Sequence, residues 1–211
     1  RKVLVVAQFT ISIIMIASTL IIYRQLQFMR NKDLGFNVES LLVIDINSGN
    51  LRRNFETVKA EFAKPSEVLS ISTSTRVPGE WKSFPISTVK AVGEPIGKEM
   101  IYVGIDNDFL STYDIKLKEG RNFSAGPADS TKVILTELAV QQLGLTNPVG
   151  QIVEIPTVRY GGSVEKLDEV LRLEVIGVIE NFHFESLRKD MMPVIFAAPN
   201  TPIQRIDYYT L

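Results

Sequence analysis

Residues 3–23 read VLVVAQFTISIIMIASTLIIY, a run without one charged side chain, between Arg1-Lys2 and Arg24. A bilayer core about 30 Å thick is crossed by about 20 apolar helical residues, and this run supplies them. The apolar part of a signal peptide is shorter, about 7–15 residues, and a soluble domain rarely holds a core helix that is apolar on every side. The run therefore predicts a membrane-spanning helix. Basic residues flank both of its ends, so the positive-inside rule does not decide its orientation.

Polar side chains interrupt the apolar run, at Gln8, Thr10, Ser12, Ser18 and Thr19. Ser and Thr hydroxyls can donate to carbonyls one turn earlier in their own helix, so they need no other partner. The Gln8 amide is costlier in lipid. Either it faces another membrane helix, or it is a tolerated polar residue near the interface.

The composition excludes several classes of protein. The 211 residues carry 23 Lys and Arg and 24 Asp and Glu, and removing residues 1–37 leaves 18 basic and 23 acidic residues. A domain with that balance lacks the basic patch that nucleic-acid binding requires. There is no cysteine, which excludes disulfides, a thiolate nucleophile and cysteine-based metal sites.

The segment after the apolar run predicts a helical stalk over residues 25–36, ended by Gly35. The residues expected to couple the membrane helix to the rest of the chain are Gln25, Leu26, Phe28, Met29 and Leu34. The alternative is that they only cover the underside of the following domain. No Gly/Ser-rich hinge interrupts residues 3–30, so a continuous helix could transmit tilt or rotation. We assign residues 1–37 to the membrane helix and stalk, and residues 38–211 to a domain outside the membrane.

This domain is predicted to interleave strands and helices irregularly. Strands are expected at residues 41–46, 68–75, 86–92, 100–105, 115–117, 132–135, 151–155, 171–179, 194–198 and 208–211, helices at 51–62, 106–113 and 137–143, and a loop tip at 160–163. Apolar and polar residues alternate over 68–75, which predicts a half-exposed strand. The irregular order indicates an α+β fold rather than a doubly wound sheet. Residues 208–211 resemble the middle of a strand, so we expect the domain to be truncated at its C-terminus.

No catalytic, metal or cofactor site is predicted. His183 is the one histidine, in NFHFESL at residues 181–187, and no G-x-S-x-G elbow accompanies it, so we expect a structural role. Asp106, Asp108 and Asp114 lack the spacing of a calcium loop, and Asp106 is instead expected to cap a helix. No glycine-rich phosphate loop is present. The sequence therefore does not indicate an enzyme.

Two large aromatic residues are candidates for contact with a partner. Trp81 and Phe84 follow the turn Val77-Pro78-Gly79 in a polar stretch. Large aromatics in polar loops often mark interaction surfaces. Packing in the core is the competing role, and it is favoured for Phe84.

Several short motifs together resemble the extracytoplasmic domain of ABC-transporter permeases of the MacB/FtsX-like family, above all the Bacteroidetes-type permeases with two such domains. The motifs are VVAQFTISI at residues 5–13, NKDLGF at 31–36, VPG at 77–79, DNDFL at 106–110, GRNF at 120–123, NPVG at 147–150 and IGVIENFHFESL at 176–187. Each motif is weak alone, but they span nearly the whole chain in the family's order. In the family they look structural, with no catalytic role to carry over.

The resemblance implies a non-enzymatic permease subunit in the bacterial inner membrane, with its main domain in the periplasm. A separate cytoplasmic ATPase subunit would hydrolyse ATP, and the extracytoplasmic domain would move to drive export or mechanical signalling. The implied partners are that ATPase, the membrane, a periplasmic protein or lipoprotein, and a second permease in a dimer. The competing function is the ligand-binding domain of a membrane-anchored sensor. An anchored hydrolase would need a nucleophile and a base that the sequence does not show.

Overall fold

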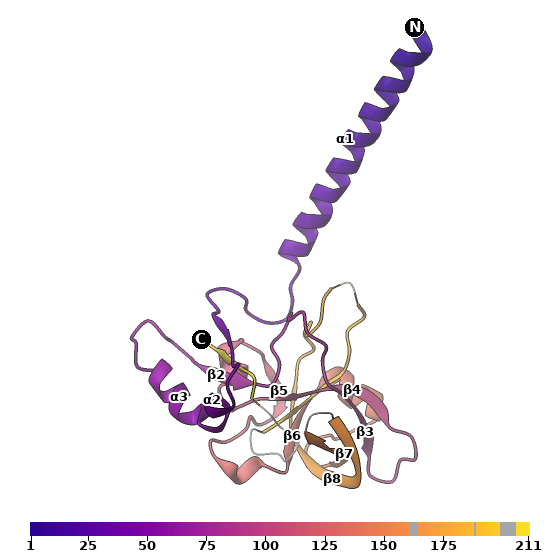
Figure 1. Ribbon diagram of the computed structural model, residues 1–211. Helices are drawn as coiled ribbons and strands as arrows, with labels where there is room; N and C mark the ends of the chain where they lie inside the picture. The colour runs from indigo at the N-terminus through magenta and orange to yellow at the C-terminus, as the bar shows by residue number, and fades with distance from the viewer. Residues whose placement is uncertain (161–163, 188, 199–205) are drawn as a thin grey trace. The chain divides into compact units, whose positions relative to one another are not determined.

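The computed structural model describes residues 1–160, 164–187, 189–198 and 206–211 (Figure 1). The chain divides into two compact units, Arg1–Leu34 and Gly35–Leu211. The division falls three residues before the boundary expected from the sequence. The predicted loop tip at 160–163 lies almost wholly outside the described residues.

The first unit is one helix, α1 (Lys2–Asn31), with no buried residue. Its length and composition suffice to cross a membrane. The hydroxyls of Thr10 and Thr19 donate to the carbonyls of Val6 and Met15 at 2.9 and 2.8 Å, which confirms the expected bonds within the helix.

The helix ends earlier than predicted. Lys32, its C-terminal cap, already has an extended backbone, so the prediction of a helical stalk as far as residue 36 is wrong in its last turn. Asn31 and Asp33 are poor helix formers because their side chains compete for backbone hydrogen bonds. Leu34 and Gly35 therefore lie beyond the helix, and Gly35 does not end it.

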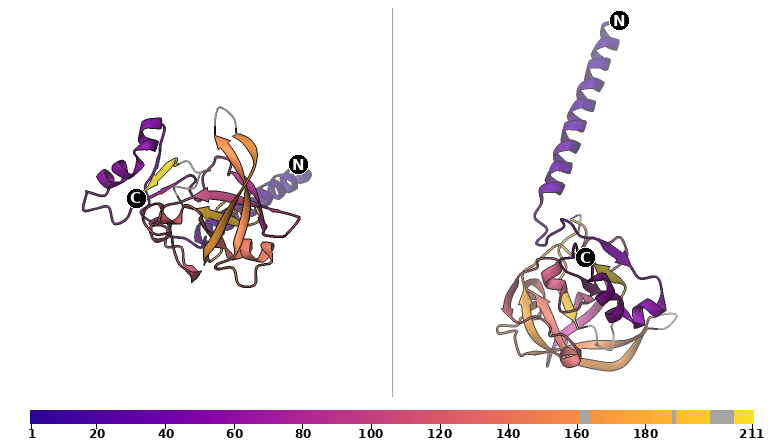
Figure 2. Two further views of the ribbon diagram at one scale, coloured as in Figure 1. Left: turned by 90° about the horizontal axis from the view of Figure 1, so that it is seen from below. Right: turned by 90° about the vertical axis from the view of Figure 1, so that its left-hand side faces the viewer.

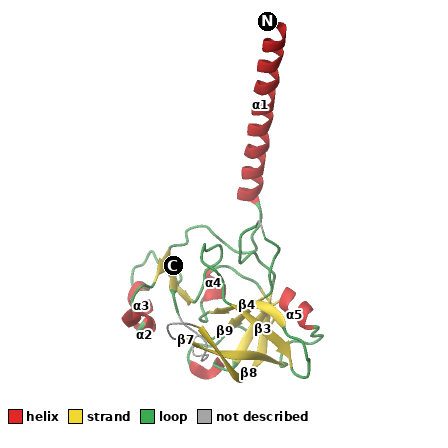
Figure 3. Cartoon of the chain, turned by 45° about the vertical axis from the view of Figure 1, so that its right-hand side comes forward, coloured by secondary structure: helices red, strands yellow, loops and turns green. Residues whose placement is uncertain are grey.

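The second unit is built around a sheet in which six strands close on themselves (Figure 3). The order β8-β6-β9-β4-β3-β7 returns to β8, because β7 pairs with both β3 and β8, and β5 also pairs with β8. The strands are β3 (Ile86–Ala91), β4 (Lys98–Gly104), β5 (Leu117–Gly120), β6 (Lys132–Thr136), β7 (Ile152–Tyr160), β8 (Val164–Ile179) and β9 (Val194–Ala197). β8 makes the closure possible by its length. It pairs with β7 from Val164 to Glu174 and with β6 from Glu174 to Ile179.

Alternate residues of these strands build two separate cores. All six strands of the ring supply the inner core, for example Met100 and Tyr102 of β4, and Ala139 of helix α5 (Glu137–Leu143) joins it. Helix α5 has the bounds predicted for it. The Thr136 hydroxyl accepts from the Ala139 N–H at its start, and Gly144 ends it in a left-handed conformation.

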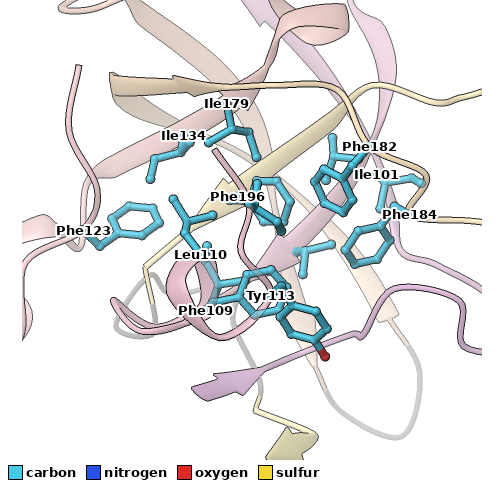
Figure 4. Packing of buried hydrophobic residues seen from close by; sticks show 14 of the residues in the cluster. Ile101, Phe109, Leu110, Tyr113, Phe123, Ile134, Ile179, Phe182, Phe184 and Phe196 are labelled. Carbon is cyan, nitrogen blue, oxygen red and sulfur yellow. The ribbon is translucent and has the colours of Figure 1, made fainter. Parts of the chain in front are cut away.

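The opposite face of β4 carries Ile101 and Val103, which belong to the second core. Rings from distant segments gather there (Figure 4). We call this set the aromatic cluster, and its members are Phe109, Tyr113, Phe182, Phe184 and Phe196.

A second, three-stranded sheet has the order β1-β10-β2, with β1 (Val43–Asp45), β2 (Ser72–Ser74) and β10 (Tyr208–Thr210). Helices α2 (Gly49–Arg53) and α3 (Phe55–Phe62) lie beside it (Figure 2). The predicted single helix over 51–62 is interrupted at Asn54, whose backbone leaves the helical region.

The prediction of a half-exposed strand over 68–75 is wrong, because all three residues of β2 are buried. One edge of β2 pairs with β10, and at its end Ser74 forms a bridge with Ile105. The Thr73 N–H and hydroxyl both donate to Asp106 Oδ2, at 2.8 and 2.9 Å. The Thr73 side chain is thus used at a junction between the two sheets, whereas the buried Ser72 and Ser74 hydroxyls have no hydrogen-bond partner among the described residues.

The GRNF motif at 120–123 forms a tight structural corner. Gly120 has φ +76°, and a Cβ there would lie 2.2 Å from the Ile176 carbonyl oxygen. Arg121 makes two bonds to Asp129, at 2.7 and 2.9 Å, and Phe123 is buried in the second core. The Arg121 guanidinium lowers the pKa of Asp129 to about 2.

We expect Asp129→Asn to destabilise the fold by about 1–2 kcal/mol at pH 7, since hydrogen bonds to a charged group are lost. A carboxyl with a lowered pKa contributes stability above its unfolded value near 4, and the contribution disappears as pH falls through about 2. The difference from wild type should therefore shrink between pH 4 and pH 2 in urea unfolding of the full chain. Glu61→Gln, in the exposed pair with Lys64, is the control. A difference that does not change with pH would contradict this assignment.

Candidate functional site

The first residues of the second unit are fixed against the aromatic cluster. Gly35 has φ +80°, and a Cβ on it would lie 2.8 Å from Phe182 Cβ. The ring of Phe36 lies 5.9 Å from that of Phe182 and 6.0 Å from that of Tyr113, both edge to face. The Asn37 N–H donates to the Tyr113 carbonyl at 2.8 Å. We call residues 35–37 the entry segment, and only residues 32–34 separate it from α1.

Tyr113 also contacts the last strand of the chain. It follows helix α4 (Phe109–Thr112), is buried, and its hydroxyl shares a 2.9 Å hydrogen bond with Thr210 Oγ1 in β10. In Figure 4 this oxygen lies on the side of the ring away from the other rings. Burial raises the pKa of Tyr113 to about 12, so the phenol stays neutral. One side chain therefore connects the entry segment with β10.

The entry region and β10 are also joined through the backbone. β1 and β10 are antiparallel partners, and Leu42 and Leu211 exchange two hydrogen bonds of 2.9 and 3.0 Å. Residues 35–45 are therefore connected to β10 in two ways, through the ladder and through Tyr113.

The DNDFL motif at 106–110 supports the same region. Lys59 Nζ of α3 lies 2.7 Å from Asp106 and 2.5 Å from Asp108. Burial lowers the pKa of Lys59, but the two carboxylates outweigh burial and raise it overall. The N-cap of α4 is Asp108, with no side-chain capping bond, so the prediction that Asp106 caps this helix is wrong. Asp106 instead accepts from the Asp108 N–H at 3.2 Å and binds Thr73 and Lys59. No group of side chains fit to hold a metal occurs in the part of the chain that the structure describes.

Trp81 and Phe84 line one groove of about 440 Å³, which we call the Trp81 groove. Its lining residues come from two segments and two strands, and they are Glu80, Trp81, Lys82, Ser83, Phe84, Ile86, Ile101, Glu185, Ser186, Lys189 and Met192. Trp81 is 90% exposed. Phe84 is half-buried with its ring 5.0 Å from that of Phe184, so it packs on the aromatic cluster, as the sequence favoured.

Two acidic side chains lie deep in the Trp81 groove. The Glu80 side chain is 4% exposed, accepts from the Val77 N–H at 3.2 Å, and has Arg76 Nε 3.3 Å from its second oxygen. Burial raises the pKa of Glu80. The Glu185 side chain is 13% exposed, and its Oε1 accepts from Lys189 Nζ at 2.8 Å. Its Oε2 is buried and accepts no hydrogen bond from any described residue.

The other predicted site residues belong to the first unit. Gln25, Leu26, Phe28 and Met29 are exposed on α1, and Leu34 lies past its end. His183 is half-buried between the buried Phe182 and Phe184.

Sequence reasoning did not find Tyr113, Glu185 or the role of Gly35. The role of Gly35 could have been suspected, because a glycine stands directly before an aromatic residue at the start of a domain. Tyr113 had none, because Thr210 is 97 residues away.

Comparison with known proteins identifies the family. Residues 3–206 match the family described as MacB-like periplasmic core domain.

The chain belongs to this family.

Two solved structures share the fold. The periplasmic region of MacB from Actinobacillus actinomycetemcomitans has a TM-score of 0.53 and 18% identity, over 83% of this chain and 75% of that one. The extracellular domain of the noncanonic ABC-type transporter YknZ from Gram-positive bacteria has a TM-score of 0.51 and 16% identity, over 81% and 82%. No curated protein matches by sequence. The expected resemblance and the α+β class are confirmed, and the family is one of transporter permease domains rather than a known enzyme class.

Tyr113→Phe removes one hydroxyl and leaves the ring packing intact. We expect a loss of about 1–2 kcal/mol in unfolding free energy, together with faster amide exchange confined to β1, β2 and β10. Hydrogen–deuterium exchange on the full chain in detergent measures this. Tyr23→Phe, on α1, removes a hydroxyl that bonds Gln27 and serves as the control. Equal acceleration in β4 and β9 would show that Tyr113 supports the whole unit and has no special connection to β10.

Proposed function

We propose that this chain is part of an ABC-transporter permease whose extracytoplasmic domain couples ATP hydrolysis by a separate cytoplasmic subunit to export or mechanical signalling. The observation that carries the proposal is the family match over residues 3–206 of a chain that also holds a membrane-length helix. The two similar structures come from MacB and from the ABC-type transporter YknZ, in line with this role.

The proposed lever begins with α1. It is 30 residues long and contains neither glycine nor proline, the residues that most often bend or weaken a helix. Only residues 32–34 separate its end from the entry segment. Since this connection is only three residues long, we propose that movement of the helix end reaches the entry segment and, through Tyr113, β10. Gln25, Leu26, Phe28, Met29 and Leu34 are the proposed coupling stalk, at the end of residues 1–37.

The proposed setting is the bacterial inner membrane, with residues 38–211 in the periplasm. The proposed partners are the ATPase subunit, a second permease in a dimer, and a periplasmic protein or lipoprotein. Gln8, exposed on α1, would face a neighbouring membrane helix in such an assembly. The acidic balance of the domain favours protein partners over nucleic acid.

Purification tests the partner directly. Affinity purification of the full-length protein from solubilised membranes should recover a stoichiometric ATP-binding subunit, and the complex should hydrolyse ATP. Mass spectrometry and an ATPase assay are the measurements. A single species without ATPase activity, or a chain bearing a kinase module, would refute the permease role and favour a membrane-anchored sensor.

The mechanical part is tested separately with a flexible insertion. Gly-Ser-Gly-Ser placed between Leu34 and Gly35 should leave ATP hydrolysis by the complex intact. It should abolish ATP-dependent changes in amide exchange of the entry segment and β10, because a flexible linker transmits little force. The same insertion after Gly93, in an exposed turn with open space around it, is the matched control. Retained ATP-dependent exchange in the first variant would disprove coupling through residues 32–34.

A further inference from the structure

The Trp81 groove presents apolar surface that a folded domain normally buries. Trp81 is 90% exposed, and Ile86 of β3 adds exposed apolar area beside it. Phe84 and Met192 form the deeper wall, where both pack against the second core. Covering one tryptophan side chain is worth about 2–3 kcal/mol, so this wall favours an occupant.

The deep part of the groove is acidic, although lysines are nearby. Lys82 Nζ is already held 2.7 Å from Asp45 and 4.9 Å from the centre of the Tyr208 ring. Lys189 pairs with Glu185 through Oε1 alone, which leaves the buried Oε2 without a donor among the described residues. A buried acceptor without a donor costs about 1–3 kcal/mol, more when it is charged. A cationic donor in the groove would recover that cost once the Glu185 side chain rotates to turn Oε2 toward it.

The exposed indole and the buried carboxylate favour an occupant with both an apolar and a basic group. We infer that the Trp81 groove binds an extended segment of a separate periplasmic protein that presents a basic side chain next to an apolar one. The basic group would donate to Glu185 Oε2, and the indole face of Trp81 would cover the guanidinium or ammonium. The apolar neighbour would pack on Phe84 and Met192.

The dimensions and charges of the groove argue against other occupants. A volume of about 440 Å³ is in the range of pockets that take small ligands, enough for two or three side chains and too small for a folded domain. The lining holds Lys82 and Lys189 against Glu80 and Glu185, so it presents no net positive charge to attract anionic lipid headgroups or nucleic acid. The bound segment must come from the extracytoplasmic side of the membrane, and in this one respect the inference rests on the proposed function.

Trp81 is the only tryptophan of the chain, so its fluorescence reports directly on the groove. The full chain in lipid nanodiscs is titrated with acetyl-Leu-Arg-Leu-amide, acetyl-Leu-Gln-Leu-amide and arginine amide. We expect the arginine peptide to bind at least about 10-fold more tightly than the glutamine peptide, and more tightly than arginine amide. Glu185→Gln should remove most of this preference. The control Glu61→Gln changes an exposed carboxylate outside the groove and should preserve it.

Several results would overturn the inference. Equal binding of the two peptides to wild type, or no response to either, would exclude charge recognition, and this comparison does not depend on how the variants fold. Equal binding of arginine amide would assign the groove to small organic cations. A response to anionic vesicles alone would assign it to the membrane, and a response to protein concentration alone would assign it to a second copy of the chain. None of these titrations involves an ATPase, so their failure would leave the proposed permease function standing.

Discussion

The close approach of Gly35 to Phe182 is the constraint on which the coupling region depends. The backbone can pass the aromatic cluster only where no Cβ is present and φ is positive, a combination that glycine alone accepts without strain. That approach brings Phe36 against Phe182 and Tyr113, and it lets the Asn37 N–H reach the Tyr113 carbonyl. The chain therefore enters the domain in contact with its core rather than through a loose linker.

The closed sheet explains why such a contact could act at a distance. In a ring of six paired strands, each strand is held on both edges, so local strain is not absorbed by an edge that frays. The small sheet is different, because β1, β2 and β10 have three residues each. It is joined to the ring by the bridge of Ser74 to Ile105 and by the bonds around Asp106. Within the second unit, displacement is thus concentrated in the small sheet.

The sequence predicts those elements whose form depends on interactions between residues close together in the chain. The Thr136 cap and Gly144 stop bracket α5 because both act within one turn, and the strands predicted at residues 86–92 and 100–105 are two strands of the ring. The burial of β2 depends on β10, more than 130 residues later, so its polar alternation misleads. Only the aromatic side of the Trp81 groove, Trp81 and Phe84, was predictable from the sequence. Its acidic half comes from Glu185, and no local pattern connects that residue with Trp81.

The strengths of the individual contacts are compatible with the proposed transmitting role. The bond between Tyr113 and Thr210 is worth about 1 kcal/mol, small against the total stability of a domain. Coupling free energies between distant sites are typically about 1–3 kcal/mol. A contact of this size can bias β10 between two positions without either position being inaccessible, whereas the buried rings behind Tyr113 keep the entry segment fixed. The weak bond and the rigid support together are what a two-position element requires.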